Sequence, residues 1–204
     1  MKRVFFFCWA VMVILSSCGN EQESLPILGE PTIVNGKQVY PRIADFDFVN
    51  QDGYHVRNAN FKDKIYVADF IFLSCPTICP VMTRELKKVY DVYQADDRVS
   101  FLSHTIDPER DTIARLKAYA EALGVLAPKW NFVTGNQDSI MNLAEKSYYS
   151  AANAASTAPA GFAHNGGFLL IDKNRNIRGV YNSLESKETD RLIADIKRLL
   201  REQF

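Results

Sequence analysis

The segment Ile65–Tyr93 constrains the fold of this chain more than any other part of the sequence. Residues 65–72 are mostly β-branched or aromatic, which predicts a strand that is covered on both faces. Two prolines break the strand around Cys75 and Cys79, and apolar residues recur at helical spacing afterwards. Pro80 suits the first position of that helix. The sequence therefore predicts a buried strand that leads through a short cysteine-containing loop into an amphipathic helix.

The spacing of Cys75 and Cys79 has a chemical consequence. Residues four apart at the start of a helix can lie on one face, so the two sulfurs can converge. The positive end of the helix dipole favours the thiolate, which is the form that binds soft metals and attacks disulfides. Two thiolates need a third ligand to hold a metal ion, and we expect His164, which lies just before a predicted strand, to supply it. Two sulfurs and one imidazole form a soft donor set that suits copper.

Two further residues are candidates for supporting roles. Residues 99–106 predict a strand beside residues 65–72, with its end near the cysteines. His104 in that strand is a reserve ligand, and its simpler interpretation is a partly buried strand histidine. Asp107 follows at the carboxyl end of the strand, where open α/β sheets place ligand contacts. It could tune the metal site through a ligand, or it could simply begin a turn.

Several stretches of the chain resemble the SCO/SenC family in order and spacing. They are Cys75–Pro80, Asp107–Thr112, Trp130 with Thr134-Gly135, and His164. This family consists of thioredoxin-fold copper-binding proteins linked to cytochrome c oxidase assembly. The resemblance extends from near Tyr40 to the C-terminus. It implies a copper chaperone that binds one Cu(I) or Cu(II) ion and delivers it to the copper-containing subunit of a cytochrome c oxidase.

The same cysteine pair permits a second function. In a thiol–disulfide oxidoreductase, Cys75 and Cys79 would cycle between dithiol and disulfide, with a thiol reductant as partner. Against this, thioredoxin-type motifs separate their cysteines by two residues rather than three, and a reductase needs no distant histidine. A structural disulfide would close a loop too short to remove much entropy from the unfolded chain. A peroxidase, a zinc site and a stapled interaction module fit less well.

The N-terminus has the composition of a targeting segment. Residues 1–17 resemble a lipoprotein-type signal peptide, with two basic residues followed by an apolar run too short to span a bilayer comfortably. The small residues before Cys18 resemble a bacterial lipoprotein cleavage box, which would make Cys18 the lipidated first residue of the mature chain. An uncleaved anchor and an ordinary secretory signal are the alternatives. Each of them places the body in the cell envelope, on the extracytoplasmic side of a membrane.

The rest of the chain predicts a tether and one domain. Residues 18–40 carry Glu, Gln, Ser, Pro and Gly with little periodicity, and we expect a tether. Residues 41–204 would form the thioredoxin-like domain. Residues 150–161 are small and polar, which predicts a surface loop that could let His164 approach the cysteines. Lys plus Arg and Asp plus Glu both number 24 with no basic run, so nucleic acid is not an expected partner.

Periodicity along residues 41–204 predicts the order of the elements. An N-terminal β-hairpin at 43–49 and 54–57 carries a solvent-facing His55. After the strand, helix and strand described above come helices that begin at Asp111 or Thr112 and at Asn136 or Asp138. The remaining segments are strands at 130–134, 168–172 and 177–181 and a helix at 187–204. This order predicts an α/β, thioredoxin-like fold with a mixed central sheet and helices on both faces.

Overall fold

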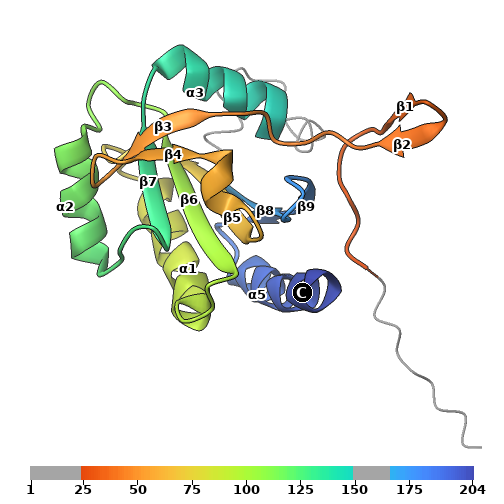
Figure 1. Cartoon of the computed structure of the whole chain (residues 1–204). Coiled ribbons are helices and arrows are strands. Elements are labelled where there is room, and N and C mark those ends of the chain that lie inside the picture. Colours follow the sequence, from red (N-terminus) through yellow and green to blue (C-terminus); the bar gives the residue numbers. More distant parts are fainter. Residues whose placement is uncertain (1–23, 149–165) are drawn as a thin grey trace, which may run out of the picture.

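A computed structural model describes residues 24–148 and 166–204 and arranges them around one mixed β-sheet (Figure 1). The order of strands in this sheet is β4-β3-β7-β6-β5-β8-β9. At its centre β5 (Ile65–Ile71) runs parallel to β6 (Val99–Thr105), which runs parallel to β7 (Trp130–Thr134). The other strands of this sheet pair antiparallel. The predicted mixed sheet is confirmed.

Helices cover both faces of the sheet. On one face lie α1 (Ile78–Tyr93), α2 (Ile113–Leu123) and α5 (Ser186–Gln203), whose apolar side chains share one core cluster. On the other face lies α3 (Gln137–Leu143), which continues into the π-helical turn η2 (Ala144–Tyr148). Figure 1 shows α3 above the sheet and α1 and α5 below it. The layers therefore match the predicted arrangement.

Strand β5 is buried along its whole length because it lies between these two layers. Successive side chains of a strand point to opposite faces. Val67 and Ile71 accordingly pack with α1 and α5, whereas Tyr66 and Phe70 pack with α3. Burial on both faces explains the unbroken apolar run that predicted this strand.

The ends of α2 lie where local sequence signals predicted them. The side chain of Thr112 accepts from the backbone N–H of Arg115, so Thr112 rather than Asp111 is the N-cap of α2. Gly124 ends this helix with φ +65°, as a C′ glycine does. By contrast, α1 begins at Ile78, so Pro80 is its third residue and not its first. A proline is tolerated there because N–H groups of the first turn have no intrahelical partner.

Both hairpins expected within the domain are present. The first consists of β3 (Asp47–Asn50) and β4 (His55–Arg57), followed by a 3₁₀ turn, η1 (Asn58–Phe61). Its first strand is shorter than the alternation indicated. The second consists of β8 (Gly167–Ile171) and β9 (Ile177–Asn182).

Part of the expected tether is ordered, which corrects the sequence-based expectation for residues 18–40. β1 (Thr32–Val34) and β2 (Lys37–Val39) form a separate two-stranded hairpin that projects from the body (Figure 1). Asn35 and Gly36 both have positive φ, as the two-residue turn of a tight hairpin requires. Upstream, Leu25 is 6% exposed and belongs to the core. The dipeptide Asn35-Gly36 was a local signal for this turn that the expectation of a tether overlooked, whereas no local pattern indicates the docking of Leu25.

Several sequence-based predictions concern residues outside the described part of the chain. These are the signal peptide at residues 1–17, the lipid attachment at Cys18, the loop at 150–161 and the ligand His164. Within residues 24–148 and 166–204, every helix is too short or too polar to cross a bilayer.

Candidate metal centre

The two cysteines lie where β5 ends and α1 begins, at the carboxyl edge of the parallel strands. The N–H of Cys75 donates to the carbonyl of Phe72 at 3.1 Å, which closes the turn after the strand. Cys79 lies in the first turn of α1. The end of β6 is held alongside, since the N–H of Ile106 donates to the carbonyl of Ile71 at 2.9 Å. The cysteine loop is therefore built on two paired strands and one helix start.

The sulfurs of Cys75 and Cys79 converge, as the spacing predicted. Both cysteines are free thiols, with residue exposures of 7% and 5%. Their side chains are hydrogen-bonded to each other. The hydroxyl of Thr77 lies 3.7 Å from the sulfur of Cys75. The pair is thus preformed in its reduced state.

The surroundings drive the pKa values of the two thiols apart. Burial raises the pKa of Cys75, but hydrogen bonds to its sulfur from the backbone and side chains of Cys79 and Thr77 outweigh burial and lower the pKa to about 7. Burial raises the pKa of Cys79 to about 12, against a backbone hydrogen bond from Phe72, and the neighbouring Cys75 and Asp69 raise it further. Near neutral pH, Cys75 is therefore partly ionised, whereas Cys79 keeps its proton and donates it to the Cys75 sulfur.

A buried carboxyl group lies behind the pair, and the sequence-based analysis missed it. Asp69, in the middle of β5, is 1% exposed, and burial raises its pKa to about 7 although Ser103 hydrogen-bonds to it. The indole N–H of Trp130 donates to the hydroxyl of Ser103 at 2.9 Å and extends this polar chain. An aspartate within an otherwise apolar strand was the signal that could have found it.

A second missed residue, Asp111, ties the cysteine loop to the sheet. Its Oδ2 accepts from the N–H of Leu73 at 3.0 Å and from the hydroxyl of Thr105 at 2.6 Å. The residue is completely buried. Because Leu73 precedes the cysteines by two residues and Thr105 ends β6, this one carboxylate fixes the loop against the neighbouring strand. The sequence suggested Asp111 only as a helix cap.

Asp107 lies at the expected edge but faces elsewhere. Its carboxylate pairs with Arg110 at 2.9 Å, and its backbone carbonyl accepts from the N–H groups of Arg110 and Asp111. It therefore shapes the turn after β6, as the simpler interpretation predicted. An influence of Asp107 on bound metal stays a prediction.

His104 is on the wrong face of the sheet to serve as a reserve ligand. Its ring packs against Phe46, Phe48, Phe70 and Tyr148 on the α3 side, whereas α1 and its cysteine lie on the other side. The reason is the strand alternation, which places His104 with Leu102 and opposite Phe101. Within the described chain, neither ring nitrogen has a hydrogen-bond partner. Burial lowers its pKa to about 3.

The other histidine of the described chain behaves as predicted. His55 lies on strand β4 with its side chain 58% exposed. Its Nδ1 lies 2.6 Å from a carboxylate oxygen of Asp47, on the neighbouring strand β3. It is a surface residue, at the edge of the sheet remote from β8 and β9.

The described residues supply two of the three expected ligands. They contain no cluster of three or more Cys, His, Asp or Glu side chains that could hold a metal ion. His164 lies outside them. The chain is described again from Gly166, where an added Cβ would lie 3.5 Å from the sulfur of Met82. Met82 is on α1, three residues after Cys79.

Comparison with known proteins gives a consistent result. The family model described as SCO1/SenC matches residues 35–201. The SCO1 protein homolog of Bacillus subtilis (strain 168) is 30% identical over 192 residues, which cover 92% of this chain and 91% of that protein.

Solved structures agree in fold. A SCO1/SenC family lipoprotein from Bacillus anthracis str. Ames has a TM-score of 0.66 at 28% identity, covering 78% of this chain and 95% of the other. A second structure is that of BsSco, described as a member of the Sco family of cytochrome c oxidase assembly proteins with a disulfide switch. It has a TM-score of 0.66 at 29% identity and covers 87% of this chain and 96% of BsSco. Yeast Sco1 with copper bound, at 21% identity, has a TM-score of 0.56 over 84% and 94% and supports the fold alone. The expected thioredoxin-like fold is confirmed.

Proposed function

The chain belongs to the SCO1/SenC family, and from that premise we propose that it binds one copper ion and passes it on during assembly of a cytochrome c oxidase. The ligands would be Cys75, Cys79 and His164. The observation that carries the proposal is the pair of converging free thiols at the start of α1. Family membership suggests the cargo and the process, since a relative from Stutzerimonas stutzeri is described as a putative copper-binding protein and BsSco as a member of a family of cytochrome c oxidase assembly proteins.

The donor chemistry of the pair fits copper. Metal binding requires deprotonated sulfur, and the pKa of Cys75 near 7 makes its thiolate available without a large cost. Cys79 would lose its proton to solvent as the metal binds, because the metal stabilises the thiolate far more than water does. Thiolates and one imidazole suit three-coordinate Cu(I), and Cu(II) would favour an added ligand.

The path of the chain supports His164 as the third ligand. Gly166 packs beside Met82, one helical turn beyond Cys79 on α1. Residues three apart on a helix are neighbours on its surface. His164 is only two residues before Gly166 in the sequence, so its backbone is joined to a position close to the cysteines.

The proposal includes a location and a recipient. Cys18 would carry the lipid that holds the protein to a membrane, with the body in the cell envelope on the extracytoplasmic side. The description of the Bacillus anthracis relative as a lipoprotein supports this. The recipient would be the copper-containing subunit of the oxidase, and transfer would proceed by exchange of thiolate ligands between the two proteins.

Copper titration of the reduced full chain tests the ligand set. We expect the double variant Cys75→Ser/Cys79→Ser to lose high-affinity Cu(I) and Cu(II) binding and His164→Ala to bind more weakly than the parent. His55→Ala is the matched control, since His55 is exposed and paired with Asp47, and it should bind as the parent does. Equal affinity of His164→Ala and parent would refute the three-ligand site.

One observation favours a second candidate function. The split between a thiolate Cys75 and a protonated Cys79 is the arrangement that thiol–disulfide exchange uses. Cys75 would attack a partner disulfide and release one partner thiolate. Cys79 would then give up its proton, displace the second partner sulfur and leave a Cys75–Cys79 disulfide. A thiol reductant would return the pair to the dithiol.

The two functions separate in a turnover assay. An oxidoreductase should reduce a disulfide substrate catalytically without copper, and His164→Ala should leave that rate unchanged. A copper carrier should show stoichiometric metal transfer and negligible turnover. The reduction potential of the pair decides which substrates it could reduce.

A further inference from the structure

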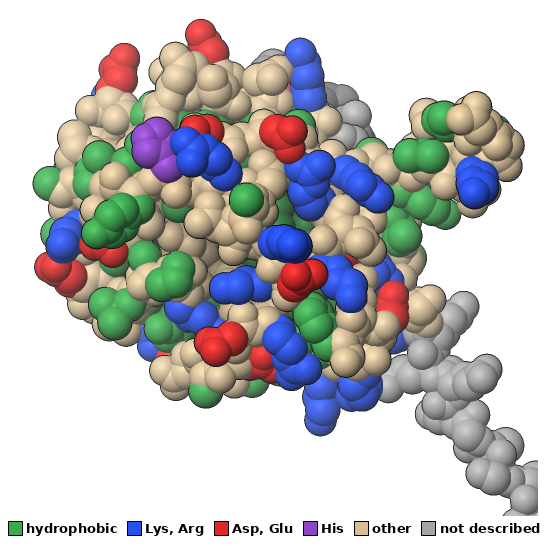
Figure 2. All heavy atoms as spheres, viewed as in Figure 1, with side chains coloured by type: hydrophobic (Ala, Val, Ile, Leu, Met, Phe, Trp, Pro, Cys, Tyr) green, Lys and Arg blue, Asp and Glu red, His purple; other side chains and the backbone are tan. Residues whose placement is uncertain are grey.

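The β1–β2 hairpin exposes three aliphatic side chains to solvent. Ile33 is 67% exposed, Val34 50% and Val39 45%, and all six strand residues are exposed. Figure 2 shows hydrophobic side chains along this projecting arm. A two-stranded hairpin alone is at best marginally stable in water. Its exposed apolar side chains therefore call for a partner or an apolar environment.

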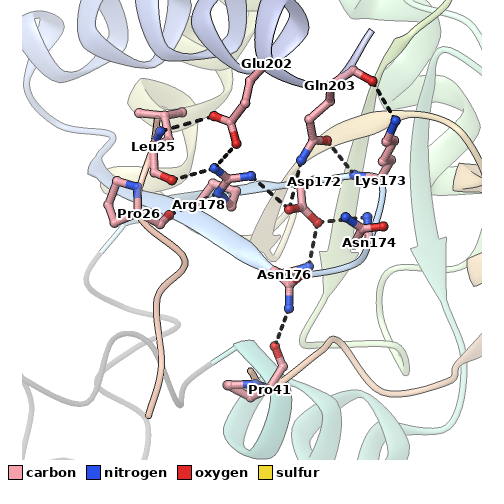
Figure 3. A network of polar contacts seen from close by, with 10 residues as sticks. All are labelled: Leu25, Pro26, Pro41, Asp172, Lys173, Asn174, Asn176, Arg178, Glu202 and Gln203. Atoms are coloured by element: carbon pink, nitrogen blue, oxygen red, sulfur yellow. Dashed lines mark hydrogen bonds and ion pairs between the residues drawn. The ribbon is translucent and has the colours of Figure 1, made fainter. Parts of the chain in front are cut away.

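The base of the hairpin is fixed to the body at both ends. The N–H of Leu28 donates to the carbonyl of Ile177 at 2.8 Å, and the side-chain amide of Asn176 donates to the carbonyl of Pro41 at 3.0 Å (Figure 3). Gly29, with φ +101°, permits the close crossing, since a Cβ there would lie 2.4 Å from Pro41. The hairpin is thus held by the region that joins β8 to β9.

A buried charge network fixes the chain just upstream (Figure 3). Arg178, with its side chain 3% exposed, donates to Asp172 at 3.0 Å and to Glu202 at 2.5 Å. It also donates to the carbonyls of Leu25 and Pro26, at 2.5 and 3.1 Å. The N–H of Leu25 donates to Glu202 at 3.2 Å. This network docks the N-terminal segment on β9 and α5.

The docked segment sets how far the body can move from a membrane. This step rests on the proposed function, in which Cys18 carries lipid. Leu25 is seven residues after Cys18, and the hairpin begins seven residues later. Because an extended chain spans at most about 3.6 Å per residue, Leu25 would stay within about 25 Å of the bilayer surface. The exposed hairpin is then within reach of the same bilayer.

The distribution of apolar side chains favours a lipid environment over a protein surface. The pairing of Thr32 with Val39 and of Val34 with Lys37 places Val34 and Val39 on one face, and Ile33 is on the other. A protein docked against the hairpin would cover one face, whereas the interfacial region of a bilayer surrounds it. Lys37, beside the turn, could keep its amine among anionic headgroups while its stem covers apolar surface.

We infer that the β1–β2 hairpin is a second membrane contact. It inserts Ile33, Val34 and Val39 into the interfacial region of the bilayer that holds the lipid of Cys18. The unpaired N–H and C=O groups along both hairpin edges keep it at that level and out of the hydrocarbon core. Two contacts, one covalent and one through the hairpin, fix the orientation of the body relative to the membrane.

Tryptophan reporters test the inference in the lipidated chain, which would begin at Cys18 and keep Trp130 as its native tryptophan. Ile33→Trp and Val34→Trp place an indole on each face of the hairpin. Tyr54→Trp is the matched control, because Tyr54 is 71% exposed next to strand β4, at the far edge of the sheet from β9. Trp130 is 1% exposed and contributes the same background to every variant. The proteins are reconstituted in phosphatidylcholine–phosphatidylglycerol vesicles whose acyl chains are brominated.

We expect the emission of both hairpin reporters to shift to the blue and to be quenched at least twofold by brominated lipid, with the control unchanged. Quenching of neither reporter, or of only one, in chains that float with the vesicles overturns the inference. If the chains do not float, the lipid anchor is refuted and the hairpin contact with it. Copper titration of the same samples reports separately on the metal site.

Discussion

The thiol of Cys79 is hydrogen-bonded to the sulfur of Cys75, and the two groups titrate far apart because burial raises the pKa of Cys79 while hydrogen bonds from Cys79 and Thr77 lower the pKa of Cys75. The Cys75 sulfur accepts several hydrogen bonds, whereas the Cys79 thiol is buried and donates one. A pair of identical side chains thereby becomes an unequal pair before any metal or substrate arrives.

This inequality predicts selective alkylation. In reduced, metal-free protein we expect Cys75 to react with iodoacetamide along a pH profile with its midpoint near 7, while Cys79 stays protected at that pH. Cys79→Ala removes the thiol donor to the Cys75 sulfur but keeps the backbone N–H of residue 79, so it should move the midpoint up. Thr77→Val should move it less. Mass spectrometry of the alkylated peptides measures both effects, and equal reactivity of the two cysteines would contradict the arrangement.

Asp111 should matter more than Asp107, although both belong to one turn. Asp111→Asn removes the negative charge that faces the Arg115 guanidinium at 3.5 Å. Its amide can accept both bonds now made to Oδ2 only by turning its NH₂ group toward that guanidinium. We expect a loss of about 1–3 kcal/mol in the free energy of unfolding, with weaker copper binding as the cysteine loop loosens. Urea titration measures the first quantity and metal competition the second.

Asp107→Asn is the matched control for this prediction. Its carboxylate pairs with an arginine whose side chain is 72% exposed, so the change in stability should stay within about 0.5 kcal/mol. A shift in copper affinity without a change in stability would support the predicted tuning role of Asp107. A cost as large as that of Asp111→Asn would contradict the distinction drawn between them.

The buried His104, whose ring has no hydrogen-bond partner among residues 24–148 and 166–204, should make the fold sensitive to acid. Its pKa falls from an ordinary 6.5 to about 3 on folding. Between these values the unfolded chain binds a proton that the folded chain excludes, so stability is lost as pH falls, by about 1.4 kcal/mol per pH unit. His104→Phe should remove that slope, because the ring already packs among aromatic side chains. Urea midpoints from pH 7 to pH 4 test this, with His55→Ala as control.

Asp69 should give the opposite slope. Its pKa rises from 3.8 to about 7 on folding, so the folded chain keeps a proton that the unfolded chain releases. Its contribution is therefore fully present below pH 3.8 and is lost as pH rises towards 7. Asp69→Asn should stabilise the protein at pH 7. In the parent, His104 and Asp69 oppose each other between pH 4 and 6.5, so the variant should gain stability more steeply as pH rises through this range. An unchanged profile would show that Asp69 is ionised in the folded protein.

Removing Arg178 should release the N-terminal segment. Arg178→Met leaves buried Asp172 without its ion pair and the carbonyls of Leu25 and Pro26 without a donor, so we expect a cost of about 3–5 kcal/mol. Limited proteolysis should then cut between residues 24 and 42 much faster. Arg175→Met is the control, since Arg175 pairs with the exposed Asp45 and should cost less than about 1 kcal/mol.

The features predicted well from the sequence are those with local causes. The apolar run at residues 65–72, the Thr112 cap and the Gly124 terminus each depend on a few neighbouring residues, and the structure contains all three. The features that escaped depend on long-range partners. Asp111 acquires its role from Leu73 and Thr105, and Leu25 from Arg178, and no periodicity records such contacts.

His104 illustrates a third situation. The predicted strand indicated that His104 would be buried, but it did not indicate on which side of the sheet the cysteines would lie. Alternation relates only the side chains of one strand to each other. Which face meets α1 is decided by how the neighbouring strands and helices pack. The cysteine spacing, by contrast, predicted convergence because both residues belong to one local turn.

The position of β5 within the sheet has a consequence for biogenesis. Val67 on β5 pairs with Leu170 on β8, so the strand that carries the cysteine loop gains its second neighbour only when the last part of the polypeptide is available. A nascent chain that has not yet reached β8 therefore presents its thiols on an incomplete sheet. A cell that makes this protein in an oxidising compartment has to guard them during that interval, and any ribosomal stall before β8 yields a product with an unfinished sheet.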